Sequence, residues 1–92
     1  MALGRPGLLF SGLATSNTGA GAALPGQGCH SITVKADPAN SGTVYVGDST
    51  VTAGTGFSLT PGESVTLPVT DMSTIYHMAS VDGQTVQYIG VT

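Results

Sequence analysis

Residues 31–47 read SITVKADPANSGTVYVG, and this stretch predicts a β-rich fold. Its first six residues alternate between apolar and polar side chains, which is the period of a strand with one buried face. The next six residues, DPANSG, favour a turn, because proline fixes φ while asparagine and glycine tolerate left-handed conformations. Residues 43–46 return as a second strand. We therefore expect a hairpin here.

Further strands are expected downstream, at residues 50–53, 57–59, 64–69, 74–81 and 85–91. Pro61-Gly62 is the favoured pair for a type II turn. Asp82-Gly83 separates the last two segments and is a dipeptide preferred in type I′ turns, so these segments are also expected to form a hairpin.

Turn signals recur about every 8 to 12 residues, and no helical period is present. We therefore expect an all-β domain over residues 29–92, a compact antiparallel β-sandwich or jelly-roll-like barrel of about six or seven short strands. Tyr88 and Ile89 cannot both point into one core, because neighbouring strand residues face opposite ways. One of them should face a partner or a second layer. The expected core is Ile32, Val34, Val44, Val46, Phe57, Leu59, Val65, Leu67, Ile75, Val86, Tyr88 and Ile89.

Residues 1–28 have a different composition, with many glycines and one charged side chain. Glycine is too dense here for a helix, and the segment lacks the alternation of a convincing strand. We therefore expect a flexible, extended N-terminal arm. Its clustered apolar residues are candidate anchors that would order on a partner: Leu8, Leu9, Phe10 and Leu13.

A signal peptide is the competing interpretation of the same segment. Arg5 would be its basic region, residues 7–14 a short apolar region, and residues 20–22 the cleavage site. The apolar region is short, is interrupted by Ser11 and Gly12, and lies far from the cleavage site. A mature chain that starts near Ala23 would support this alternative and a secreted domain.

Only 8% of the residues are charged, against about 25% in a typical soluble domain. Serine, threonine and glycine fill the polar positions, and such a surface is cheaper to bury than one of lysine and glutamate. A domain of about 60 residues usually needs disulfides, a metal or a partner to be robust. Cys29 is the sole cysteine, which excludes a disulfide within the chain. The composition therefore indicates association with other subunits.

The sequence contains few candidate catalytic or metal-binding residues. No serine lies in a G-x-S-x-G motif. His77 is expected to pack in a strand, and Cys29-His30 lacks further ligands at metal-binding spacing. The acidic residues lie mostly in turns, where local hydrogen bonds explain them. We expect no enzyme, no cofactor and no metal. A net charge of −3 argues against nucleic acid, and no apolar run has the length of a membrane span.

Several motifs together resemble small β-domains of virion proteins from tailed bacteriophages. They are VYVGDSTVT at residues 44–52, GFSLTPGESV at residues 56–65, DMSTIY at residues 71–76 and DGQTV at residues 82–86. The resemblance covers about residues 31 to 91 and leaves out the arm.

The resemblance implies a structural virion protein, namely a capsid decoration (cement) protein on the outer capsid surface. It would bind the major capsid protein and copies of itself, with a homotrimer as the expected oligomer. The alternative is a tail or head-fibre component, or a receptor- or carbohydrate-binding module. A carbohydrate site would have to use Tyr45, Tyr76 and Tyr88, the three tyrosines of the chain.

Overall fold

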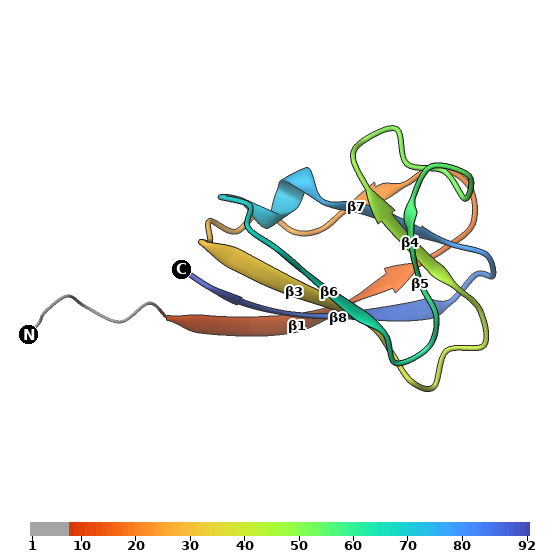
Figure 1. Cartoon of the computed structure of the whole chain (residues 1–92), viewed down its shortest axis with the longest axis horizontal. Helices are drawn as coiled ribbons and strands as arrows, with labels where there is room; N and C mark the ends of the chain where they lie inside the picture. The colour runs from red at the N-terminus through yellow and green to blue at the C-terminus, as the bar shows by residue number, and fades with distance from the viewer. Residues whose placement is uncertain (1–7) are drawn as a thin grey trace, which may run out of the picture.

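A computed structural model describes residues 8–92 and shows an all-β protein (Figure 1). Six strands follow residue 28, within the predicted number of about six or seven, and two more precede it. A short 3₁₀ helix, η1 (Met72–Thr74), lies between the sixth and seventh strands. The strands are β1 (Leu9–Ser16), β2 (Ala22–Ala23), β3 (Ser31–Ala36), β4 (Val44–Gly47), β5 (Phe57–Leu59), β6 (Ser64–Leu67), β7 (Tyr76–Ala79) and β8 (Gln84–Val91).

The strands form two antiparallel sheets of four. Sheet A has the order β1-β8-β3-β6, and sheet B has the order β2-β7-β4-β5. Among the described strands, β4 and β5 are the one pair of consecutive strands that are hydrogen-bonded to each other. Every other connection carries the chain from one sheet to the other.

Both predicted hairpins are therefore wrong. β3 pairs with β6 and β8, whereas β4 pairs with β5 and β7. Likewise β7 lies in sheet B and β8 in sheet A, although the turn between them contains Asp82-Gly83. A turn signal marks a reversal of the chain, but it does not decide whether the next strand joins the same sheet or the facing one.

The turn before β8 is hydrogen-bonded to the turn after β1. One carboxylate oxygen of Asp82 accepts hydrogen bonds from both the N–H and the hydroxyl of Thr18, each at 2.8 Å. The Gly83 N–H donates to the side-chain oxygen of Asn17 at 2.9 Å. Gly83 has a φ of 80°, which glycine adopts without strain. These contacts tie the two inter-sheet connections together.

One apolar core takes residues from the inner faces of both sheets. Of the predicted core residues, Val65, Leu67 and Tyr88 are half-buried against it, while Phe57 and Ile89 are exposed, contrary to prediction. Tyr88 and Ile89 do face opposite ways, and Ile89 is the outward one. The confirmed core residues are Ile32, Val34, Val44, Val46, Leu59, Ile75 and Val86.

The turn predictions had mixed outcomes. Gly62 has a φ of 90° and the Glu63 N–H donates to the Thr60 carbonyl at 2.9 Å, so a tight turn forms at Pro61-Gly62 as expected. The strand expected over residues 50–53 is absent, because this segment is a turn that buries Val51.

The extended arm expected over residues 1–28 is not found for residues 8–28. β1 pairs with β8 along its whole length, from Leu9 opposite Val91 to Ser16 opposite Gln84. β2 pairs with β7. Figure 1 shows β1 lying beside β8 along one border of the fold. Residues 1–7 of the predicted arm lie outside the described residues.

The segment after β1 is also part of the fold. Leu24 is 2% exposed, lies in the core and donates its N–H to the Ile75 carbonyl at 3.0 Å. Gln27 donates its N–H to the Asp71 carboxylate, and the Met72 N–H donates to the Gln27 carbonyl. Residues 24–27 therefore contact residues of the expected domain, and the structure has no boundary between arm and domain after residue 28.

Candidate interaction surface

The outer face of sheet A carries a group of exposed apolar side chains, which we call the outer patch. In β1, Leu9 is 71% and Leu13 is 67% exposed, and in β8, Ile89 is 48% exposed. The register sets Leu9 opposite Val91 and Ser11 opposite Ile89, so Leu9 and Leu13 are both diagonal neighbours of Ile89 on the same face. The outer patch consists of Leu9, Leu13, Ile89 and Val91.

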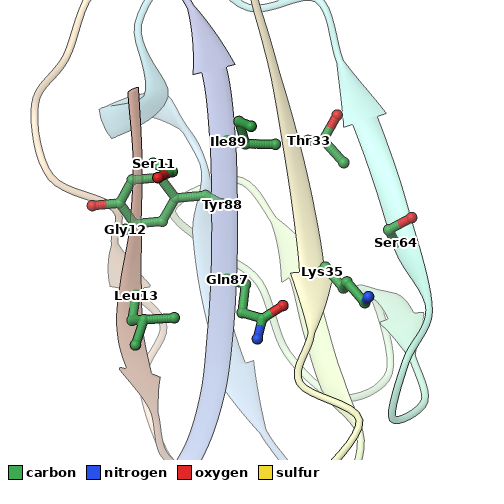
Figure 2. Close-up of a pocket in the computed structure, with 9 residues that line it drawn as sticks. All are labelled: Ser11, Gly12, Leu13, Thr33, Lys35, Ser64, Gln87, Tyr88 and Ile89. Carbon is green, nitrogen blue, oxygen red and sulfur yellow. The ribbon is translucent and has the colours of Figure 1, made fainter. Parts of the chain in front are cut away.

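A shallow depression of about 400 Å³ overlaps the outer patch, since Leu13 and Ile89 line it together with polar side chains of β3, β6 and β8 (Figure 2). Lys35 in β3 is the one lysine of the chain, and it lies between Gln87 of β8 and Ser64 of β6. Thr33 and Thr66 share a hydroxyl–hydroxyl hydrogen bond of 2.9 Å on the same face. The whole face is therefore apolar toward β1 and hydroxyl-rich toward β6, with one positive charge.

The four predicted anchor residues do not act alike. Leu8, Leu9 and Leu13 point to solvent, and all three are at least 66% exposed. Phe10 points inward, where it is half-buried against the core and packs over Gly90; a Cβ at Gly90 would lie 3.0 Å from a ring carbon of Phe10. Phe10 thus fastens β1 to the core, while the three leucines remain available for contact.

A second hollow, of about 440 Å³, opens between the edges of the two sheets. Val65 and Leu67 line it from β6, Val69 lines it from the segment after β6, and Phe57 lines it from β5. Phe57 is 60% exposed because β5 is the edge strand of sheet B and no described residue covers this side. The hollow is apolar and contains no pair of side chains suited to acid–base chemistry.

Ser16 and His77 form a buried pair that the sequence did not predict. The Ser16 hydroxyl lies 2.9 Å from Nδ1 of His77, and the side chains are 1% and 3% exposed. The spacing is that of a nucleophile and its base, but a nucleophile must be reachable by a substrate, and this hydroxyl is enclosed. His77 is therefore a packed histidine, as expected, and its partner could have been found from sequence only if β1 had been recognised.

The acidic side chains serve turns and caps. The pKa of Asp48 is lowered by hydrogen bonds from Thr50, that of Glu63 by bonds from Thr60, and that of Asp82 by bonds from Thr18. Asp71 caps η1 by accepting from the Ser73 N–H at 2.9 Å, which lowers its pKa as well. These hydrogen bonds, of which those from Thr18 to Asp82 join residues far apart in the chain, explain the carboxylates without a ligand.

Cys29 and His30 point in opposite directions, as neighbouring residues of an extended chain do. Cys29 is buried, and its thiol lies 3.2 Å from the Val69 carbonyl, whereas His30 is exposed. Burial, followed by the nearby charge of Asp71, raises the pKa of the thiol. Within residues 8–92, no three His, Cys, Asp or Glu side chains lie close enough together to hold a metal ion.

The three tyrosines do not form one platform. Tyr45 of β4 and Tyr76 of β7 alternate with buried neighbours, which places both on the outer face of sheet B. Tyr88 belongs to sheet A and packs against the core. The aromatic site required by the carbohydrate-binding alternative is thus divided between two sheets.

Comparisons of the chain with protein-family models, with curated proteins and with solved structures found no match. No helix within residues 8–92 has the length and apolar character needed to cross a membrane.

Proposed function

We propose that the protein is a structural virion component, a capsid decoration (cement) protein that attaches to the outer surface of a shell and to copies of itself. The outer patch carries the proposal, because Leu9 and Leu13 are among the most exposed large apolar residues described and lie side by side with Ile89. A contiguous apolar patch on a small domain marks an interaction site.

The chemistry of the rest of the surface supports attachment over catalysis. With 8% charged residues, few ions must lose their hydration when the surface is covered. The depression that overlaps the outer patch presents hydroxyl and amide groups from Thr33, Ser64 and Gln87, which can pair with backbone groups of another protein. Many weak contacts of this kind, repeated over a lattice, stabilise a shell through multivalency.

The sequence resemblance to virion β-domains supplies the virion context and the expectation of a homotrimer bound to the major capsid protein. We also assign the packing of sheets A and B to the β-sandwich class, since the core residues come from the inner faces of both sheets. Attachment would use the folded face that includes β1, rather than a free arm.

Binding to empty shells tests the proposal. Purified protein is mixed with shells prepared without it, from the virus whose genome encodes it, and co-sedimentation is measured. We expect saturable binding that Leu13→Lys weakens at least tenfold. The matched control is Val81→Lys, since Val81 is 46% exposed but lies in the turn between β7 and β8.

Equal binding of both variants would contradict the role of the outer patch. Absence of the protein from shells, with electron microscopy placing it on a tail or head fibre, would replace the decoration role by the fibre alternative. Absence from the particle altogether would contradict a virion role.

A further inference from the structure

The free edge of sheet A is β1, and the backbone pattern shows which of its groups are unpaired. The Thr92 N–H donates to the Leu8 carbonyl at 2.9 Å, so these residues form a hydrogen-bonded pair. In antiparallel strands such pairs alternate, which directs the even-numbered residues of β1 toward β8. The odd-numbered residues turn their N–H and C=O groups away from β8, where no described strand lies: Leu9, Ser11, Leu13 and Thr15.

The other three sheet edges are protected in ways that β1 is not. β2 has two residues and β5 has three. β6 has four and is followed by Pro68, which has no N–H to donate. β1 has eight residues and contains neither a charge nor a proline. Natural edges are guarded by short length, proline or charge, so among the described strands β1 is the edge open to another chain.

The outer patch borders this edge. Leu9 and Leu13 have outward-facing backbone groups and exposed apolar side chains at the same positions. Strand addition combines these two features, since backbone hydrogen bonds give affinity and alternate side chains add contact. The unpaired backbone groups of β1 can therefore pair with a further strand.

We propose that the occupant is β1 of a second copy, paired antiparallel about a two-fold axis. β1 is complementary to itself, because antiparallel pairing sets its outward donors opposite identical acceptors. One register uses all the outward groups: Ser11 pairs with Leu13 of the second copy, and Leu9 with Thr15. Four outward residues in each copy then give about eight backbone hydrogen bonds.

In this register the two Gly12 residues face each other across the two-fold axis. The Tyr88 ring occupies the space of the missing side chain, since a Cβ at Gly12 would lie 2.7 Å from the ring carbon that bears the hydroxyl. Figure 2 shows the ring extending from β8 across β1. The two Tyr88 hydroxyls would thus approach each other on one side of the joined sheet, and the two Leu13 side chains on the other.

The pairing uses the β1 edge of both copies, so assembly through this edge stops at two chains. It gives a dimer with a continuous eight-stranded sheet, rather than the trimer that the resemblance implies. The inference concerns the sheet edge and holds whether or not the protein is part of a virion, so the binding of shells and the self-pairing can fail independently.

The mass of the full chain in solution tests the inference, by analytical ultracentrifugation across a concentration series. Ser11→Pro removes one outward N–H without removing a bond to β8. Thr66→Pro is the matched control, because the Ala36 N–H donates to the Glu63 carbonyl and the alternation then directs the Thr66 N–H outward on the β6 edge. Leu13→Lys is a second edge variant that changes an exposed side chain and leaves the backbone of β1 intact.

We expect the unmodified chain and Thr66→Pro to form dimers with the same affinity. Ser11→Pro and Leu13→Lys should be monomers over the same range, or dissociate at least tenfold more readily, with unchanged circular dichroism. If Ser11→Pro unfolds, Leu13→Lys decides. A monomer at every concentration, a trimer, or a Leu13→Lys variant that dimerises like the unmodified chain would overturn the inference.

Discussion

The hydroxyl of Ser16 lies 2.9 Å from Nδ1 of His77, and this hydrogen bond joins the end of β1 in sheet A to β7 in sheet B. Both side chains are buried. Burial lowers the pKa of His77, because the charged imidazolium is poorly solvated there. Stability therefore depends on a neutral histidine at the junction of the two sheets.

Acid should destabilise the fold through His77. Its folded-state pKa lies below its unfolded value of about 6.5, so the unfolded state binds the proton more readily and stability falls as the pH drops below that value. For one titrating group, the free energy of unfolding cannot change by more than about 1.4 kcal/mol per pH unit. Thermal unfolding at pH 7 and pH 5 measures the loss.

His77→Asn is the control, since its amide can bond Ser16 but does not titrate. Its melting temperature should change less between pH 7 and pH 5 than that of the unmodified chain. The hydrogen-bonded carboxylates of Asp48, Glu63 and Asp82 have lowered pKa values, and their contribution is lost only below about pH 4.5. Equal pH dependence in both proteins would contradict the role of His77.

Two leucines of the predicted arm should respond differently to truncation. Leu24 is 2% exposed in the core, so Leu24→Ala should cost about 3 kcal/mol of unfolding free energy. Leu13 is 67% exposed, and Leu13→Ala should stay within about 0.5 kcal/mol. Urea unfolding measures both under conditions where the chain is monomeric. Similar small effects would show that Leu24 is not part of the core.

Removal of residues 1–28 should abolish the fold, although the sequence alone predicted a separate domain over residues 29–92. The deletion removes β1, β2 and Leu24, and it leaves the edge of β8 that pairs with β1 without a partner. We expect the remaining chain to lack a cooperative thermal transition. A sharp transition near that of the full chain would restore the arm interpretation.

Cys29 should react slowly with thiol reagents in the native protein. Its thiol is buried against the Val69 carbonyl and its pKa is raised, so little thiolate is present at pH 8. Labelling with a colorimetric disulfide reagent should be at least tenfold faster in urea than in buffer. Equal rates would indicate that the segment around Cys29 opens freely.

The sequence predicted some elements closely, because their signals are local. Ile32 and Val34 alternate with polar residues, and the predicted strand at residues 31–36 has the bounds of β3. The turn at Pro61-Gly62 needs a positive φ, which glycine supplies. These features depend on neighbouring residues alone, so a single sequence suffices to find them.

The sequence did not predict β1, because its large apolar residues mostly face solvent and its inward residues are mostly small. Its inward positions after Phe10 are Gly12, Ala14 and Ser16, which are small, while Leu9 and Leu13 face solvent. Gly12 is small because Tyr88 from β8 covers it. A strand whose inner face is filled by a neighbour's side chain shows no apolar alternation of its own.

Two residues of the outer patch, Leu9 and Leu13, were already candidate anchors in the sequence. Leu8, Leu9 and Leu13 were predicted to be anchors that contact a partner, and they are exposed, but Leu9 and Leu13 lie on β1 and Leu8 directly precedes it. Ile89 joins them through the pairing of β1 with β8, a contact between residues distant in the chain. That pairing, like the Ser16–His77 bond, follows from the sheet topology, which local patterns do not specify.

Residue-resolved amide hydrogen exchange over β1 tests most directly whether the N-terminal segment is a folded strand with an open edge for a second chain. We expect the amides of Phe10, Gly12 and Ala14, which face β8, to be protected at every protein concentration. The amides of Ser11 and Leu13 should exchange fast in dilute protein and become protected as the copies associate. Fast exchange of the whole segment, or edge amides that stay unprotected at high concentration, would contradict the account.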